Sequence, residues 1–198
     1  MDILAKLLGS PIRVKLMRLF LFNDESIFDL KTVSARIRGQ KSSVRKELNA
    51  LCSMSFIKKR IVKGKTIGYS INPDFEFLKP IKALLIDPEF ISRNELISRL
   101  RPAGKIKLLI VAGVFIQNPE SRLDILIVSD KLKRPTLDEA MRKLESEIGK
   151  ELAYAVFSAE EFSYRLDMYD KLVADVLDFP HEKLLTTPEF STFNLKKS

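Results

Sequence analysis

The net positive charge of this chain is confined to its first 74 residues, so we expect two chemically different modules. Residues 1–74 carry 15 Lys and Arg against 6 Asp and Glu, whereas residues 75–198 carry 19 against 20. The net charge of +8 for the whole chain therefore belongs to its first third. A compact basic module of this kind is typical of a protein that binds nucleic acid.

Length, apolar content and cysteine count indicate which classes of protein this chain can belong to. A chain of 198 residues with 45% hydrophobic residues has enough apolar side chains for the cores of two small domains. The single cysteine, Cys52, excludes an internal disulfide bond, and the first residues lack the apolar run of a signal peptide. Residues 108–116 form the longest apolar stretch, far below the ~20 residues of a membrane-spanning helix. We expect a cytoplasmic protein without a membrane partner.

The basic module shows the order helix, helix, turn, helix, hairpin. Ser10 and Pro11 favour the start of a helix, as N-cap and first helical residue. Apolar spacing predicts a short second helix over residues 30–37 and a third over residues 41–54. In the turn between them, Gly39 is expected to adopt a positive φ. Alternating apolar residues predict strands over 57–62 and 67–71, joined by a tight turn at Gly64.

The third helix has two different faces. Val44, Leu48 and Leu51 recur at helical spacing and are expected to face the core. The opposite face mixes cations, which contact phosphates, with short polar side chains, which can read base edges. The predicted DNA contacts are Arg38, Gln40, Lys41, Ser42, Ser43, Arg45, Lys46 and Asn49, with Lys63 and Lys65 at the hairpin tip. The alternative is an ordinary solvated helix face, since charged helix faces are common.

Residues 8–71 resemble the winged-helix repressors of the ArsR type. The resemblance lies in the segments LGSPIRVKLMRLF, VSARI, SSVRKELNALCSMSFI and RIVKGKTIGYSI. It implies a third helix that reads the major groove, a hairpin wing along the DNA backbone or in the minor groove, and a homodimer on paired half-sites. Many such repressors sense metals through clustered Cys and His. Only Cys52 and His181 are present here, so we expect neither a metal site nor a cofactor, and Cys52 is expected to pack in the core.

Two short helices are predicted in a connector, residues 75–103, with Ser92 capping the second. Its apolar residues need a partner surface, which is either the second domain or another subunit. They are Phe90, Ile91, Ile97 and Leu100.

Residues 104–185 are predicted to form a small α/β domain, which gives an α+β fold for the chain: an N-terminal winged helix-turn-helix followed by this domain. Strands are expected over 105–115, 123–128 and 151–157. A capping box, Thr136 with Glu139, is expected to start a helix that ends at Gly149. A long helix should run from the cap Ser158 to residue 177. The tail, residues 186–198, is polar, although Phe190 and Phe193 could dock on the core.

This second domain is similar to the minimal nucleotidyltransferases in scaffold, but it lacks their chemistry. That family places a Gly-Ser turn after its first strand, a pair of carboxylates on the second and a third carboxylate on the third, which together bind two magnesium ions. Here Gly113 is followed by Val114, Arg122 replaces the first carboxylate, and Asp124 matches the second. We therefore expect a degenerate, catalytically inactive domain with a vestigial motif, in which Asp124 pairs with Arg122. The alternative is a domain that has retained nucleotide or anion binding.

The sequence thus favours a DNA-binding transcriptional regulator, a homodimer on double-stranded DNA, with an assembly or sensing domain for an unknown small-molecule or protein effector. One alternative is an active nucleotidyl- or adenylyltransferase of the antitoxin type with an autoregulatory DNA-binding domain. Another is an adaptor whose N-terminal module contacts protein, which predicts no salt-dependent affinity for DNA.

Overall fold

The computed structural model describes residues 3–62, 64, 66–86 and 91–191 and has a mixed α+β fold. The chain divides into two compact units. Unit 1 comprises residues 1–90 and 142–151, and unit 2 comprises residues 91–141 and 152–198. The expected connector, residues 75–103, is therefore divided between the two units at residue 90.

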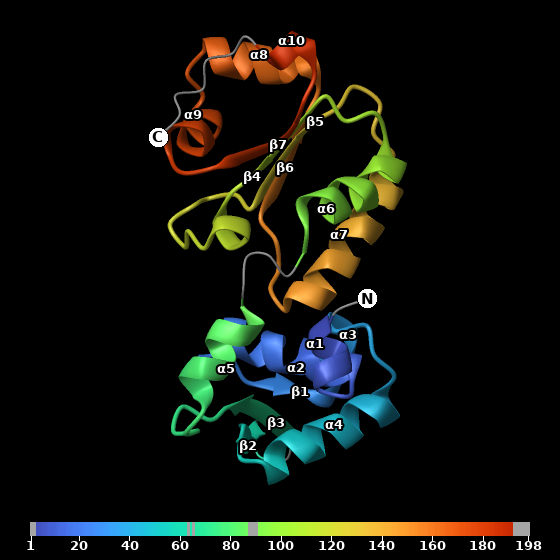
Figure 1. Cartoon of the computed structure of the whole chain (residues 1–198), viewed down its shortest axis with the longest axis vertical. Helices are drawn as coiled ribbons and strands as arrows, with labels where there is room; N and C mark the ends of the chain where they lie inside the picture. Colours follow the sequence, from blue (N-terminus) through green and yellow to red (C-terminus); the bar gives the residue numbers. More distant parts are fainter. Residues whose placement is uncertain (1–2, 63, 65, 87–90, 192–198) are drawn as a thin grey trace. The chain divides into compact units, whose positions relative to one another are not determined.

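Unit 1 is built of helices and a small antiparallel sheet (Figure 1). Its elements are α1 (Ile3–Leu7), α2 (Pro11–Phe22), β1 (Phe28–Asp29), α3 (Leu30–Arg36), α4 (Lys41–Ser53), β2 (Ile57–Val62), β3 (Thr66–Ile71) and α5 (Leu78–Leu85). Strand β3 lies between β1 and β2 and pairs antiparallel with both. The predicted hairpin is confirmed, with Ile61 opposite Ile67 and Gly64 at a φ of +77° in its turn.

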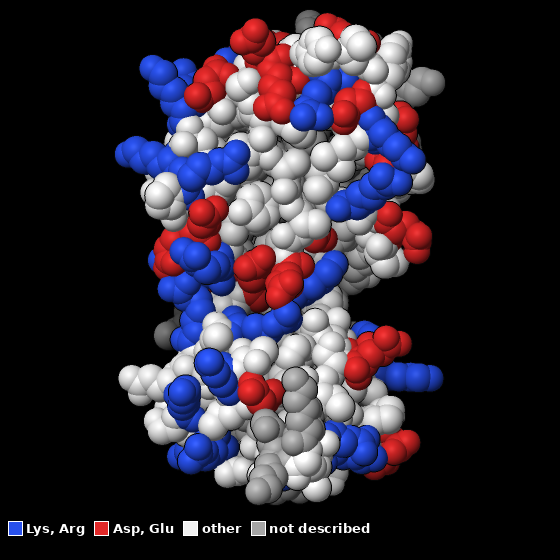
Figure 2. Space-filling view, turned by 180° about the vertical axis from the view of Figure 1, so that it is seen from behind, with Lys and Arg blue, Asp and Glu red and all other residues white. Residues whose placement is uncertain are grey.

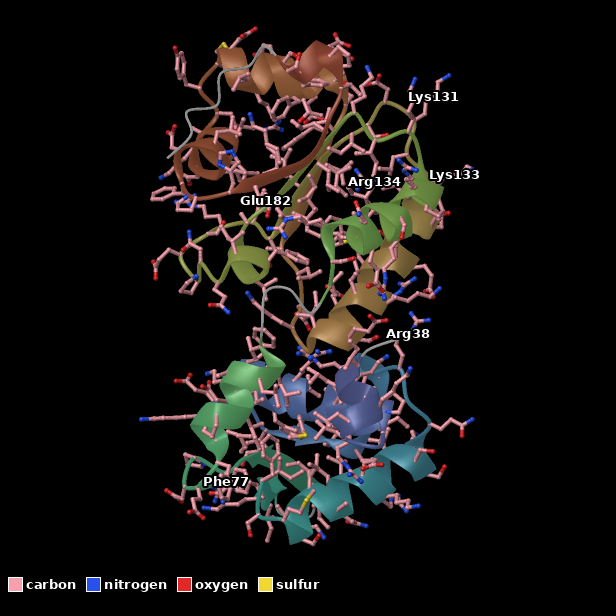
Figure 3. The ribbon with its side chains drawn as sticks, in the orientation of Figure 1. Arg38, Phe77, Lys131, Lys133, Arg134 and Glu182 are labelled. Atoms are coloured by element: carbon pink, nitrogen blue, oxygen red, sulfur yellow. The ribbon has the colours of Figure 1, made fainter. Side chains whose placement is uncertain are left out.

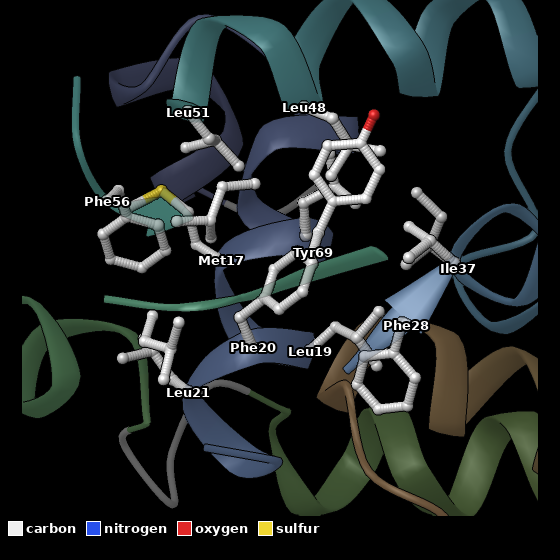
Figure 4. Close-up of a cluster of buried hydrophobic side chains, with 14 of the residues drawn as sticks. Met17, Leu19, Phe20, Leu21, Phe28, Ile37, Leu48, Leu51, Phe56 and Tyr69 are labelled. Atoms are coloured by element: carbon white, nitrogen blue, oxygen red, sulfur yellow. The ribbon is translucent and has the colours of Figure 1, made fainter. Parts of the chain in front are cut away.

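Helix α2 lies at the centre of the core of unit 1. Leu19 and Phe20 of α2 pack among Leu48 and Leu51 of α4 and Tyr69 of β3 (Figure 4). Ser10 caps α2 as predicted, because its side-chain oxygen accepts a hydrogen bond from the amide of Arg13.

The turn before α4 differs from the expectation in one respect. Arg38, rather than Gly39, adopts the left-handed conformation, with a φ of +55°. Glycine is needed at position 39 for a different reason, because a Cβ there would lie 2.7 Å from Cγ2 of Val44. Gly39 therefore lets the turn approach the first turn of α4.

Residues 142–151, the end of helix α7 (Arg134–Ile148) and the residues after it, belong to unit 1 rather than to the predicted second domain. Arg18 of α2 is buried and donates hydrogen bonds to the carbonyls of Leu85 and Glu147. Gly149 ends α7 as predicted, with a φ of +86°, and a Cβ there would lie 2.5 Å from the amide nitrogen of Leu19. Glycine is thus required both by the backbone conformation and by the close approach to α2.

Unit 2 contains a sheet in the order β6-β5-β4-β7. Its elements are α6 (Arg93–Leu100), a 3₁₀ turn η2 (Arg101–Ala103), β4 (Leu108–Val111), a 3₁₀ turn η3 (Gly113–Ile116), β5 (Ile125–Val128), the start of α7, β6 (Tyr154–Phe157), α8 (Ala159–Asp167), α9 (Lys171–Asp178), β7 (Glu182–Thr186) and α10 (Pro188–Ser191). Strand β4 is antiparallel to β5 and β7, and β5 is parallel to β6. Figure 1 shows α8, α9 and α10 against one face of this sheet, and α6 with the start of α7 against the other.

Several element boundaries predicted for unit 2 were wrong, and the strand predicted over 151–157 begins only at Tyr154. The strand predicted over 105–115 is shorter, because the chain turns at Gly113, whose φ is +52°. The helix predicted from Thr136 begins earlier, at Arg134, so Thr136 lies in its first turn instead of capping it. The caps Ser92 and Ser158 are confirmed, since each accepts a hydrogen bond from the amide three residues later.

The long helix predicted from Ser158 to residue 177 is divided into α8 and α9. Tyr169 adopts a φ of +52°, which ends α8, and the carboxylate of Asp170 caps α9 by accepting bonds from the amides of Leu172 and Val173. The tail expected to start at residue 186 is partly structured. Phe190 is only 2% exposed and stacks edge-on against Phe162, whereas Phe193 lies outside the described residues.

Candidate nucleic-acid interface

Helix α4 separates its apolar and polar residues as the sequence predicts. Val44, Leu48 and Leu51 are fully buried against the core of unit 1. Of the eight polar residues predicted for the turn and the helix, seven lie on α4 or directly before it. Six of these seven are exposed and Ser43 is half-buried; the seven are Gln40, Lys41, Ser42, Ser43, Arg45, Lys46 and Asn49. Because a helix turns by about 100° per residue, Lys41, Arg45 and Asn49 form one stripe and Ser42 and Lys46 the next.

The single carboxylate of α4 does not oppose these cations. Glu47 is turned toward α2, where its Oε2 lies 2.9 Å from Nε of Arg13, and its side chain is only 13% exposed. Lys41, Arg45 and Lys46 form no ion pair with the residues that the structure describes. The outer face of α4 therefore presents uncompensated positive charge together with hydroxyl and amide groups.

The eighth predicted residue, Arg38, is exposed in the turn before α4. The remaining two predicted contacts, Lys63 and Lys65, lie outside the described residues. The strand before them carries two exposed cations that the sequence analysis did not single out, Lys59 and Arg60. Their signal was present in the segment IKKRIV, which does not alternate as a half-buried strand should.

The two side chains of Lys59 and Arg60 have different surroundings. Lys59 lies near Cys52 at the end of α4. Burial raises the pKa of the Cys52 thiol, and the positive charge of Lys59 partly opposes this rise. Cys52 packs against the core of unit 1, as expected. Arg60 lies 3.4 Å from the hydroxyl of Ser70 on the paired strand. The exposed charge of the hairpin thus begins next to the end of α4.

The three residues of unit 2 that were predicted to form a vestigial motif are only partly brought together. Gly113 lies two residues after the end of β4 and Asp124 directly precedes β5, and a Cβ on Gly113 would lie 2.2 Å from Oδ1 of Asp124. Arg122 does not pair with Asp124 as expected. Its Nε lies 2.7 Å from Oδ2 of Asp175, a residue of α9.

The carboxylate of Asp124 is held by backbone amides. Its Oδ1 accepts a hydrogen bond of 2.8 Å from the amide of Val114, and its Oδ2 accepts one of 2.9 Å from the amide of Ala153. The residue is 3% exposed. Asp124 thus joins the turn after β4 to the start of β6, and both of its oxygens are engaged in doing so.

No group of three or more His, Cys, Asp or Glu residues within the described ranges is arranged to bind a metal ion. The same ranges contain no helix with the length and apolar character needed to cross a membrane.

One hollow of unit 1 lies beside the turn that precedes α4. It has a volume of about 170 Å³, below the ~300–1,000 Å³ typical of sites for drug-sized ligands. Its charged lining consists of Arg36, Arg38, Arg142, Glu145, Lys150 and Glu151. Both signs of charge line this hollow, so its composition selects no class of effector.

Comparison of the chain with protein-family models, with curated proteins and with solved structures gives no match in any of the three.

Proposed function

We propose that this protein is a sequence-specific, DNA-binding transcriptional regulator that acts in the cytoplasm as a homodimer. The observation that carries the proposal is the outer face of α4, which is exposed, cationic and free of carboxylates because Glu47 is paired with Arg13. Its cations suit phosphates, and Ser43, Arg45 and Asn49 suit base edges in the major groove. In this proposal α4 is the recognition helix of a winged helix.

The hairpin β2–β3 is the wing in this proposal. Lys59 and Arg60 extend the positive charge from the end of α4 along β2, toward the turn at Gly64. Figure 2 supports this assignment, since Lys and Arg predominate on the face of unit 1 that it shows, whereas acidic side chains gather near α8 of unit 2. Lys63 and Lys65 would contact the phosphate backbone and contribute no sequence discrimination.

We propose further that unit 2 is a catalytically inactive, nucleotidyltransferase-like domain used for assembly or for sensing a small-molecule or protein effector. The engagement of Asp124 by two backbone amides supports this, because a magnesium site needs several oxygen ligands that are free to coordinate. The guanidinium of Arg122 stands where the family has its first carboxylate, and it pairs with Asp175 instead.

The assignment of α4 is tested by variants of the full chain. Arg45→Ala should lower the ratio of affinities for a duplex from the protein's own upstream region and a scrambled duplex by about tenfold, the loss of one base contact. Ser43→Ala should lower that ratio as well. The matched control is Lys79→Ala, which removes one exposed charge from α5 of the same unit. If Arg45→Ala behaves like Lys79→Ala, α4 is not the recognition helix.

The enzyme alternative is tested by incubating the wild-type protein with a labelled nucleoside triphosphate and magnesium. The proposal predicts no covalent transfer of label to protein, RNA or water. Transfer that depends on magnesium would show that unit 2 is an active nucleotidyl- or adenylyltransferase.

A further inference from the structure

Unit 2 has equal numbers of basic and acidic residues, but they are distributed unevenly along its sequence. Residues 91–141 carry 9 Lys and Arg against 6 Asp and Glu, and residues 152–198 carry 5 against 8. The cations are therefore concentrated in the first part of the unit, although its total charge would suggest no affinity for an anion.

Five of these cations lie in two segments, residues 101–105 and 131–134, that contact each other. An isolated antiparallel bridge joins Gly104 to Leu132, and the amide of Lys133 donates a 2.7 Å hydrogen bond to the carbonyl of Ala103. Gly104 is required at this junction, because a Cβ there would lie 2.3 Å from the carbonyl oxygen of Lys131. We name Arg101, Lys105, Lys131, Lys133 and Arg134 the second basic surface.

The second basic surface carries uncompensated charge. All five side chains are exposed, and none forms an ion pair or a side-chain hydrogen bond with the part of the chain that the structure describes. Figure 3 shows Lys131 and Lys133 projecting outward next to the start of α7, near Arg134.

Two carboxylates that flank the second of these segments, residues 131–134, in the sequence, Asp130 and Asp138, have partners elsewhere. Asp130 lies 2.6 Å from Nζ of Lys107 and accepts a hydrogen bond from the amide of Ala159. Those bonds, the one from Lys107 first, hold the pKa of Asp130 below its ordinary value of 3.8, so it remains ionised and paired. Asp138, in the first turns of α7, accepts a hydrogen bond from the hydroxyl of Tyr154.

The chemistry of this surface suits a chain of phosphates. Its cations lie in two segments of the chain, and neither residues 101–105 nor residues 129–135 include an aromatic side chain on which a base could stack. The surface also lies at the opposite end of the sheet from the vestigial motif, since β4 runs from Lys105 toward Gly113 and β5 returns from Asp124 toward Lys131. It is therefore separate from the nucleotide site that the fold would imply.

We propose that the second basic surface binds the phosphate backbone of duplex DNA without reading its sequence. This inference rests on the proposed function, because it adds a contact to the same class of partner. The contact raises affinity for every duplex equally, whereas α4 supplies the discrimination.

The test compares two double variants of the full chain that remove the same charge from unit 2. Lys131→Ala with Lys133→Ala alters the surface, and Lys171→Ala with Lys183→Ala removes two exposed lysines from α9 and β7. The first should weaken binding of native and scrambled duplexes by the same factor, about tenfold or more at low salt. It should also lower the slope of log affinity against log salt by about 2, because each lost phosphate contact accounts for about 0.9. The second should stay within about twofold of wild type.

If the two double variants have equal affinities for DNA and equal salt slopes, the inference is wrong. Arg45→Ala, measured in parallel, separates that result from failure of the proposed function. If Arg45→Ala loses discrimination while the two double variants behave alike, the regulator stands and the second basic surface is not a DNA contact. If the wild-type protein shows no salt-dependent affinity for any duplex, both proposals are wrong.

Discussion

The carboxylate of Asp124, which the sequence predicts to be part of a vestigial motif, has a structural role in unit 2. It accepts hydrogen bonds from the amides of Val114 and Ala153, which belong to two different connections of unit 2. Removing a buried acceptor leaves both donors without a partner, which is more costly than the net value of the bonds themselves.

Asp124→Ala should therefore destabilise the protein by roughly 2–4 kcal/mol, measured by urea unfolding. Asp124→Asn keeps one acceptor oxygen and should have a smaller effect. Glu120→Ala, which removes an exposed carboxylate from the preceding loop, is the control and should leave the stability unchanged. Equal stability of Asp124→Ala and wild type would contradict the structural role.

Asp29 links stability to pH through the cap of α3. Its carboxylate accepts a hydrogen bond from the amide of Thr32, and this bond, followed by one with the Thr32 side chain, lowers the pKa of Asp29 below its ordinary value of 3.8. A lowered pKa in the folded state means that the ionised cap stabilises α3 above pH 3.8 and loses this effect as the pH falls through the lowered value.

The corresponding prediction concerns the difference in melting temperature between wild type and Asp29→Asn. Asparagine can cap the helix but does not titrate, so the difference should be present at pH 6 and vanish in strong acid. Thermal melts across this range measure it. A difference that stays constant with pH would show that the charge of Asp29 has no part in the cap.

At the scale of elements, the break between α8 and α9 is the clearest departure from the sequence prediction. The amide of Asp170 bonds to the carbonyl of Arg165, and that of Tyr169 bonds to the carbonyl of Leu166. This is the Schellman pattern, in which the residue with positive φ is usually glycine. Tyrosine stands there instead, so the usual signal for the end of a helix is missing from the sequence.

Tyr169→Gly should stabilise the protein. The left-handed conformation costs an L-residue about 1–2 kcal/mol, and the entropy lost by glycine offsets part of that gain. With Tyr169 88% exposed, little packing is lost, and we expect a gain of about 0.5–1 kcal/mol in urea unfolding. A loss of stability would show that the tyrosine ring contributes packing that its exposure does not indicate.

Elements with a strong local pattern were predictable, and elements defined by distant contacts were not. The hairpin β2–β3 and the buried face of α4 follow from periodicity and a glycine turn, both of which are local. Strand β7 was missed because its residues, EKLLT, alternate weakly and gain their role by pairing with β4. The second basic surface was missed for the same reason, since a bridge between Gly104 and Leu132 assembles it.

At the scale of the whole molecule, the division of charge along the sequence does not coincide with the division into two compact units. The basic segment predicted the candidate DNA face of α4. It could not predict that residues 142–151 belong to unit 1, because their place depends on partners more than 120 residues away, such as Arg18 with Glu147. Homodimer formation likewise remains a prediction from the resemblance of the N-terminal module.

We propose that α4 reads sequence while the cations of both units bind phosphates. The complex with DNA should then have two separable properties: a preference between duplexes that depends on α4, and a salt dependence that depends on the total number of phosphate contacts.

Fluorescence anisotropy of the wild-type protein tests this account most directly. The protein is titrated against a duplex from its own upstream region and against a scrambled duplex over a series of salt concentrations. We predict tighter binding of the native duplex at every salt concentration and a steep loss of affinity for both duplexes as salt rises. Absence of binding to either duplex at low salt would contradict the account and would favour a protein partner for unit 1.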